Sequence, residues 1–187
     1  LNKLLIRILL HLQVEFSRYM MNVESKIISR EISPLLWKAG ETVCTAESCT
    51  SGQISAAITS VPGSSTYFKG GIVCYTNEIK TRFLGVSQEL LEEKGAVSEE
   101  VVRAMFEGAL EAMETTYAIA ITGYAGPGGG EEAPVGTIWI AVGDKNEVTV
   151  EKLEGDDGRD MNLAKATLVA LQLLLDLLKK RHPQEEE

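Results

Sequence analysis

Histidine is scarce in this sequence: His11 and His182 are the only two among 187 residues, and both lie in terminal segments. A Ser-His-Asp or Cys-His catalytic site needs an internal histidine, which this chain does not have. A zinc site is disfavoured as well, because paired cysteines are also missing. Any hydrolytic chemistry must therefore use lysine, tyrosine or carboxylates as its proton carriers.

Cysteine and positive charge are also in short supply. Cys44, Cys49 and Cys74 are an odd number at spacings that match no metal motif, which favours a reduced, cytoplasmic protein. Cys44 and Cys74 lie in apolar segments and are expected in the core, whereas Cys49 is an alternative nucleophile to Ser48. The net charge of −9 argues against nucleic-acid binding, but a small anionic ligand responds to the local field instead.

A long uninterrupted apolar run is missing from the N-terminus. Residues 1–20 vaguely resemble a signal or membrane-surface helix, but Lys3, Arg7 and Arg18 interrupt them too early for a bilayer span of about 20 residues. We therefore expect no membrane partner and interpret residues 1–20 as a non-essential extension. A single domain is expected over 21–180, followed by a charged, disordered tail over 181–187.

Strand and helix patterns alternate along the first part of the chain. Strands are predicted at 41–46, 67–75, 118–122, 137–142 and 148–153. Helices are predicted at 23–39, with an interruption near Pro34, and at 54–61, 78–84, 98–114 and 160–180. Alternation followed by a hairpin predicts an α/β fold. It would be a three-layer α/β/α single domain with a mixed, mostly parallel sheet and a C-terminal hairpin.

Three segments end at the edge of the sheet where open α/β folds bind ligands, namely the carboxyl ends of the strands. Ser48 follows the first strand, Tyr75 ends the second, and Thr122-Gly123 ends the third. Ser48 lies at a strand-to-helix turn, where a serine serves as a nucleophile or, more commonly, as a helix N-cap. With Asn77 as N-cap, Lys80 lies in the first helical turn. There the helix dipole and burial would favour the neutral amine of a general base. The alternative is a solvated surface lysine.

A glycine-rich loop at 122–130 can bring backbone amides close to an anion. It is neither a P-loop nor a dinucleotide fingerprint, because no helix follows it. Arg159, after the sequence Gly155-Asp156-Asp157-Gly158, is either an anion-pairing guanidinium or an ordinary surface arginine.

Seven segments together resemble the CinA C-terminal domain family, the competence/damage-inducible proteins, whose characterised members are nicotinamide-nucleotide amidohydrolases. They run in the family's order over 23–178 and are 45–50 (TAESCT), 61–65 (VPGSS), 75–80 (YTNEIK), 84–86 (LGV), 95–100 (GAVSEE), 122–130 (TGYAGPGGG) and 134–137 (PVGT). Three positions depart from the usual pattern. Ser51 replaces a second glycine, Tyr124 replaces a small aliphatic residue, and Met161-Asn162-Leu163 lack a second basic residue after Arg159.

The resemblance implies an amidohydrolase that converts nicotinamide mononucleotide to nicotinate mononucleotide and ammonia without a metal or cofactor. It implies a Ser-Tyr-Lys site of Ser48, Tyr75 and Lys80, and a small-molecule nucleotide substrate bound by a homo-oligomer. The substrate-binding residues would be Cys49, Thr50, Asn77, Thr122, Gly123, Gly126, Gly128 and Arg159. Two alternatives stay open: a catalytically silent nucleotide-binding or assembly domain, and an amidase for another small amide.

Overall fold

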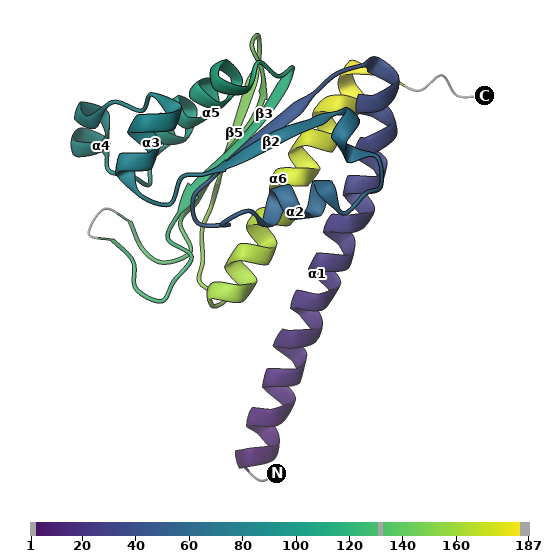
Figure 1. Cartoon of the computed structure of the whole chain (residues 1–187). Coiled ribbons are helices and arrows are strands. Elements are labelled where there is room, and N and C mark those ends of the chain that lie inside the picture. Colours follow the sequence, from purple (N-terminus) through teal and green to yellow (C-terminus); the bar gives the residue numbers. More distant parts are fainter. Residues whose placement is uncertain (1–2, 131–132, 184–187) are drawn as a thin grey trace.

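The computed structural model describes residues 3–130 and 133–183, which form an α/β domain (Figure 1). The helices are α1 (Lys3–Ala39), α2 (Gln53–Thr59), α3 (Asn77–Leu84), α4 (Gln88–Lys94), α5 (Glu99–Met113) and α6 (Arg159–Arg181). The strands are β1 (Val43–Glu47), β2 (Phe68–Val73), β3 (Tyr117–Gly123), β4 (Ile138–Asp144) and β5 (Val148–Leu153). The predicted strands and helices are all present, although helix α4 was not predicted.

The five strands form one mixed sheet in the order β2-β1-β3-β4-β5. Strand β1 lies between β2 and β3 and is parallel to both, whereas β4 is antiparallel to β3 and β5 is antiparallel to β4. Four strands thus run in one direction and only β4 opposes them, which confirms the mostly parallel sheet and the C-terminal hairpin. The parallel arrangement brings the carboxyl ends of β1, β2 and β3 to the same edge.

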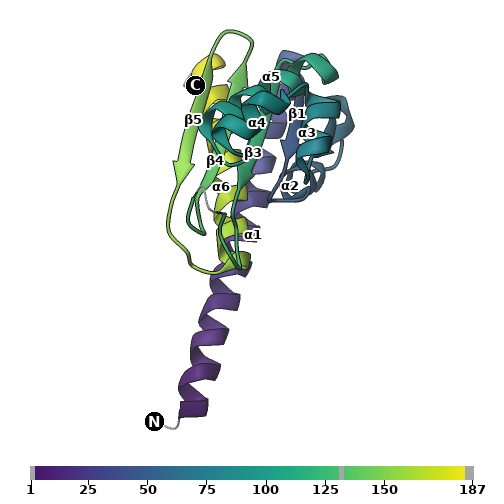
Figure 2. The ribbon, with the colours of Figure 1, turned by 90° about the vertical axis from the view of Figure 1, so that its left-hand side faces the viewer.

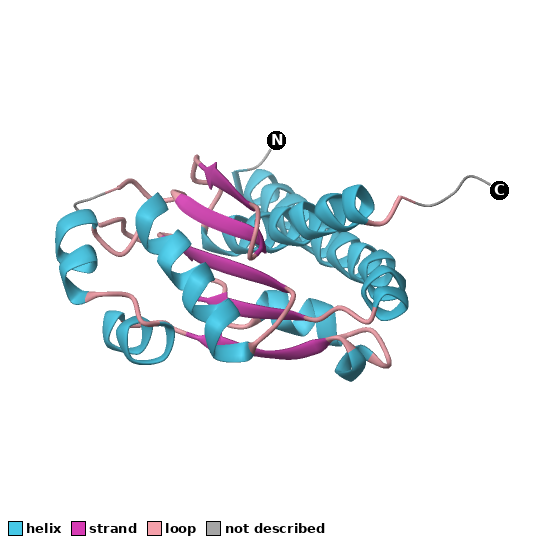
Figure 3. Ribbon diagram, turned by 90° about the horizontal axis from the view of Figure 1, so that it is seen from above, coloured by secondary structure: helices cyan, strands magenta, loops and turns pink. Residues whose placement is uncertain are grey.

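Helices cover both faces of this sheet, as the view from above shows (Figure 3). The alternating side chains of β3 illustrate the two cores that result. Ile119 and Ile121 pack on the side of α1, α2 and α6, and Ala118 and Ala120 face α5 on the other side. Small alanines allow α5 to lie close to the sheet. The three-layer α/β/α architecture is therefore confirmed.

Helix α1 is continuous from Lys3 to Ala39, so the predicted interruption near Pro34 is wrong. Burial of Ile32 and Leu36 in the core holds the helix together across the proline, although proline removes one backbone donor. Its C-terminal half packs beside α6, and its N-terminal half extends beyond the sheet in two perpendicular views (Figures 1 and 2). Residues 3–20 therefore continue the helix of the domain; that they are non-essential stays a prediction.

Helix α6 is apolar because it is a core helix. Its length and composition would allow it to cross a membrane, but 56% of its most apolar window is buried inside the domain. Its C-terminus is also fixed further along than predicted, because Arg181 forms an ion pair with Asp144 at 2.9 Å and His182 contacts Glu41 at 2.7 Å. The expected disordered tail therefore does not begin at residue 181. Residues 184–187 lie outside the described residues.

Candidate active site

The predicted convergence of Ser48, Tyr75 and Thr122-Gly123 is present in the structure. Ser48 directly follows β1, Tyr75 follows β2 by two residues, and Thr122 and Gly123 end β3. Together with Lys80 from α3 and Arg159 from α6, they line one cavity of about 270 Å³. Residues from five separate elements thus meet at the carboxyl edge of the parallel strands, where the topology predicts a ligand site.

Ser48 and Lys80 are in direct contact inside this cavity. The Lys80 amine lies 3.3 Å from the Ser48 hydroxyl oxygen and donates a hydrogen bond of 3.1 Å to the Cys74 carbonyl oxygen. Ser48 is 8% exposed and Lys80 only 2%. The Cys74 carbonyl orients the amine toward the serine. The alternative interpretation of Lys80 as a solvated surface lysine is therefore wrong.

Burial lowers the pKa of Lys80, because removal from water penalises the ammonium form. Among the described acidic side chains, none forms an ion pair with this amine that would offset the penalty. The predicted helix cap needs a correction, since Thr76 caps α3 and accepts a hydrogen bond from the Ile79 N–H. Lys80 is thus one residue further into the helix than expected, and desolvation is the main cause of its lowered pKa.

Tyr75 lies at the mouth of the cavity and is 57% exposed. Its hydroxyl accepts a hydrogen bond of 3.4 Å from the Arg159 guanidinium, which also donates one of 2.7 Å to the Gly126 carbonyl oxygen. Arg159 therefore joins the glycine-rich loop to Tyr75 and keeps further N–H donors for a ligand. Arg159 is exposed and also lines the cavity, so its pairing with an anionic ligand stays a prediction.

The glycine-rich loop closes one side of the cavity with its main chain. Thr122 donates its hydroxyl proton to the Ala96 carbonyl at 2.8 Å, which ties the end of β3 to the segment before α5. Gly126 and Gly128 have φ values of +97° and +80°, which favour glycine. At Gly123, a Cβ atom would lie 2.6 Å from the Ile138 side chain and 2.8 Å from the Thr137 carbonyl.

Two further predicted binding residues, Cys49 and Asn77, line the cavity, but Thr50 does not. Burial raises the pKa of Cys49 to about 12, so its thiolate is scarce at neutral pH and it is a poor alternative nucleophile. Thr50 is fully buried and donates its hydroxyl to Glu47 at 2.8 Å. The predicted contact of Thr50 with the substrate is therefore wrong. Thr50 instead contacts Glu47 below the turn that carries Ser48.

Glu47 is the residue that sequence reasoning missed. It is the last residue of β1, it is fully buried, and its carboxylate accepts hydrogen bonds from residues 50, 52, 54 and 55. A charged residue next to Ser48, at the end of a short strand of small and apolar residues, was the available signal, because carboxylates are almost never fully buried unless they are paired. Asn162 was missed in the same way. It joins the cavity loop to α6 through a 3.0 Å hydrogen bond to the Ala125 carbonyl.

The backbone amides after Ser48 are mostly in use. The Ser48 N–H donates to the Ile121 carbonyl at 3.0 Å, and the Ser51 N–H donates to the Ser48 carbonyl at 3.2 Å. The amides of residues 52, 54 and 55 donate to Glu47, and that of residue 53 donates to the Thr50 carbonyl. The amides of Cys49 and Thr50 lie within reach of the Cys49 thiol, and they are the candidates for an oxyanion hole in this turn.

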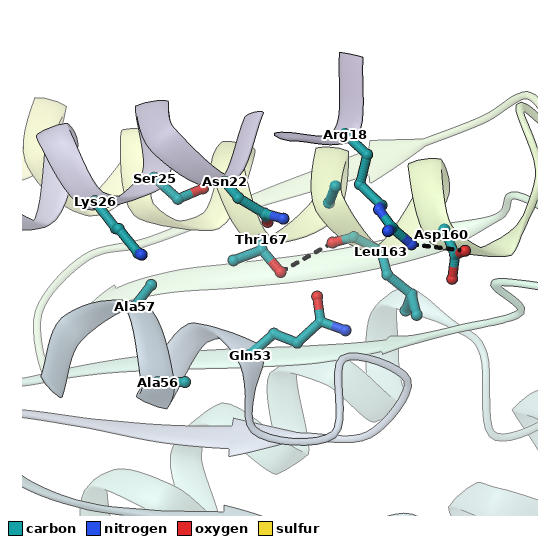
Figure 4. A pocket seen from close by; sticks show the side chains of 11 residues that line it. Arg18, Asn22, Ser25, Lys26, Gln53, Ala56, Ala57, Asp160, Leu163 and Thr167 are labelled. Atoms are coloured by element: carbon teal, nitrogen blue, oxygen red, sulfur yellow. Dashed lines mark hydrogen bonds and ion pairs between the residues drawn. The ribbon is translucent and has the colours of Figure 1, made fainter. Parts of the chain in front are cut away.

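A second, larger cavity lies between α1, α2 and α6 (Figure 4). Its volume is about 450 Å³, and the Arg18–Asp160 ion pair of 3.0 Å crosses one end of it. No predicted site residue lines this second cavity, so the cavity at the strand ends is the candidate active site.

Comparisons with known proteins assign this chain and its fold to a family. The sequence profile of the CinA C-terminal domain matches residues 25–178, and the chain belongs to this family. A competence/damage-inducible protein from Agrobacterium tumefaciens has the same fold. Its crystal structure aligns with a TM-score of 0.80 at 39% identity, over 82% of this chain and 95% of that one.

Two curated relatives carry the name nicotinamide-nucleotide amidohydrolase PncC. The Pseudomonas putida protein is 49% identical over 136 residues, which cover 72% of this chain and 85% of the relative. The Escherichia coli K12 protein is 45% identical over 149 residues, which cover 79% of this chain and 90% of the relative.

Proposed function

We propose that this protein is an amidohydrolase that converts nicotinamide mononucleotide and water to nicotinate mononucleotide and ammonia. The observation that carries the proposal is the 3.3 Å contact between the Lys80 amine and the Ser48 hydroxyl, in the cavity that also holds Arg159. The two PncC relatives, at 45–49% identity, support the same substrate.

In this mechanism Ser48 is the nucleophile and Lys80 is the general base. The neutral amine of Lys80 accepts the Ser48 proton while the serine oxygen attacks the carboxamide carbon. The amides of Cys49 and Thr50 would stabilise the oxyanion. The protonated Lys80 then returns the proton to the leaving nitrogen, ammonia departs, and an ester to Ser48 remains. A water molecule, deprotonated by Lys80, hydrolyses that ester and releases nicotinate mononucleotide.

Tyr75 and Arg159 would hold the substrate rather than move the first proton, since the hydroxyl of Tyr75 contacts Arg159. The guanidinium would pair with the 5′-phosphate, and the glycine-rich loop and Asn77 would contribute polar groups from the cavity wall. The cytoplasmic location and the homo-oligomeric state expected from the sequence stay part of this proposal.

Ammonia release across a panel of amides tests the proposal. We expect nicotinamide mononucleotide to be hydrolysed, and nicotinamide, nicotinamide riboside, glutamine and asparagine to react far more slowly. Hydrolysis of another amide in preference would support the second alternative, an amidase for a different small amide. Binding of the mononucleotide without ammonia release from any amide would support the silent nucleotide-binding domain.

A further inference from the structure

The Glu47 carboxylate is fully buried directly beneath the Ser48 turn. Burying a carboxylate is costly unless hydrogen bonds replace its hydration. Here five donors do so. Among the ion pairs of residues 3–130 and 133–183, none includes Glu47, so its partners are neutral groups of its own chain segment.

These donors come from the turn between β1 and α2 and from the first turn of α2. One carboxylate oxygen accepts from the Thr50 hydroxyl at 2.8 Å, the Gly52 N–H at 2.9 Å and the Ile54 N–H at 3.1 Å. The other accepts from the Ser55 N–H at 2.8 Å and the Ser55 hydroxyl at 2.7 Å. Helix α2 has no side chain at its N-cap that does this, so Glu47 satisfies its first amides.

The turn needs such a support because its backbone is strained. Ser51 has a φ of +52°, which is uncommon for a residue with a side chain, and Gly52 follows with a φ of +96°. Strained backbone persists where the surrounding structure over-determines it. Five hydrogen bonds to one buried carboxylate are the over-determining contacts here.

The position of Ser48 depends on this turn from one side. On the other side the sheet holds it, since the Ser48 N–H donates to Ile121 and the Glu47 carbonyl accepts from the Cys74 N–H at 2.8 Å. Cys74 in turn orients Lys80. The sheet thus places Lys80, while the turn places the Ser48 hydroxyl against it through the 3.2 Å hydrogen bond from Ser51 to the Ser48 carbonyl.

We propose that Glu47 is a positioning residue for Ser48: its carboxylate holds the β1–α2 turn so that the serine hydroxyl stays in contact with the Lys80 amine. The inference rests on the proposed role of Ser48 as nucleophile. Its consequence is specific, because a displaced nucleophile lowers kcat and leaves substrate binding nearly unchanged.

The experiment compares Glu47→Gln with a matched control, Thr45→Val. Glutamine has the same size and keeps one acceptor, but its NH₂ group would meet the Ser55 N–H, donor against donor. The Thr45 hydroxyl pairs with the Ser55 hydroxyl at 2.7 Å, so its loss destabilises the same cluster and leaves all contacts of Glu47 in place. Three quantities are measured: the thermal midpoint, kcat and KM for nicotinamide mononucleotide, and the rate at which a sulfonyl fluoride labels Ser48, followed by peptide mass.

Glu47→Gln is expected to lower kcat and the labelling rate by about tenfold to a hundredfold, with KM within about twofold of wild type. Thr45→Val is expected to lower the thermal midpoint and keep both rates within about twofold. The proposal is overturned if Glu47→Gln keeps both rates, or if the two variants lose rate in proportion to their loss of stability.

If Glu47→Gln does not fold, Thr50→Val decides the question, because it removes one donor from the carboxylate and keeps the charge. A fall in kcat at constant KM supports the proposal, and an unchanged kcat overturns it. A wild-type protein that releases no ammonia refutes the proposed substrate only, because Ser48 labelling does not depend on that substrate. Failure of the wild type to be labelled at Ser48 would overturn the positioning role.

Discussion

Replacing Lys80 by methionine tests the proposed general base. Methionine is close to lysine in length and fills the buried space without a titratable group. General-base catalysis contributes about 10²- to 10⁴-fold, which is about 2.7–5.5 kcal/mol of activation free energy. No histidine lies in the cavity to replace the amine. We therefore expect kcat for Lys80→Met to fall by about this factor at neutral pH, measured as ammonia release from nicotinamide mononucleotide.

The same substitution should raise stability, and the effect has a defined pH dependence. Burial lowers the pKa of Lys80 in the folded protein below its unfolded value of 10.5. The unfolded chain therefore binds more protons between these two pKa values, and the penalty is full below the folded pKa and disappears as the pH rises through 10.5. Lys80→Met should have a higher thermal midpoint than wild type at pH 7, and the two midpoints should converge as the pH rises through 10.5.

Lys80→Arg is the matched control, because arginine keeps a positive charge but is not deprotonated in proteins. A general base predicts that Lys80→Arg is as inactive as Lys80→Met. It also predicts that the wild-type kcat rises with pH through one lowered lysine pKa. Wild-type activity in Lys80→Arg, or a chemical step that is independent of pH from about 6 to 10, would refute the assignment.

Four further substitutions test the rest of the site. Ser48→Ala should abolish ammonia release and leave the thermal midpoint nearly unchanged, because the Ser48 hydroxyl does not cap α2; retention of more than a few per cent of activity would refute Ser48 as the nucleophile. Arg159→Ala should weaken binding of the mononucleotide by about 1.5–3 kcal/mol, seen in KM rather than kcat, and equal losses for the riboside would exclude phosphate recognition. Ser51→Gly should raise the free energy of unfolding by about 0.5–1 kcal/mol in a denaturant titration, because glycine relieves the positive φ; a decrease would contradict the strain. Gly123→Ala should lower the free energy of unfolding by about 1–3 kcal/mol, because a Cβ has no room beside Ile138; an unchanged free energy of unfolding would show that β4 moves aside.

Much of the architecture could be predicted from the order of the apolar patterns. Strand β3 is an uninterrupted run of apolar residues, which is typical of a strand buried on both faces, and the hairpin at 143–146 follows from its turn residues. The continuity of α1 through Pro34 could not be predicted from the sequence. A proline disfavours helix locally, but the burial of Ile32 and Leu36 against the domain overrides that preference.

The sequence alone also determined which chemistry is available: with both histidines in terminal segments, lysine, tyrosine and carboxylates are the remaining candidates for a proton carrier near Ser48. Only the tertiary structure decided between Lys80 as a buried candidate base and Lys80 as a surface lysine. Its 3.3 Å contact with a serine 32 residues away depends on the parallel pairing of β1 with β2. The burial that lowers the pKa of Lys80 is likewise a property of the packed domain, and so are the five hydrogen bonds that Glu47 accepts. Local sequence specifies backbone preference and side-chain chemistry, whereas desolvation requires neighbours that the chain brings together only on folding.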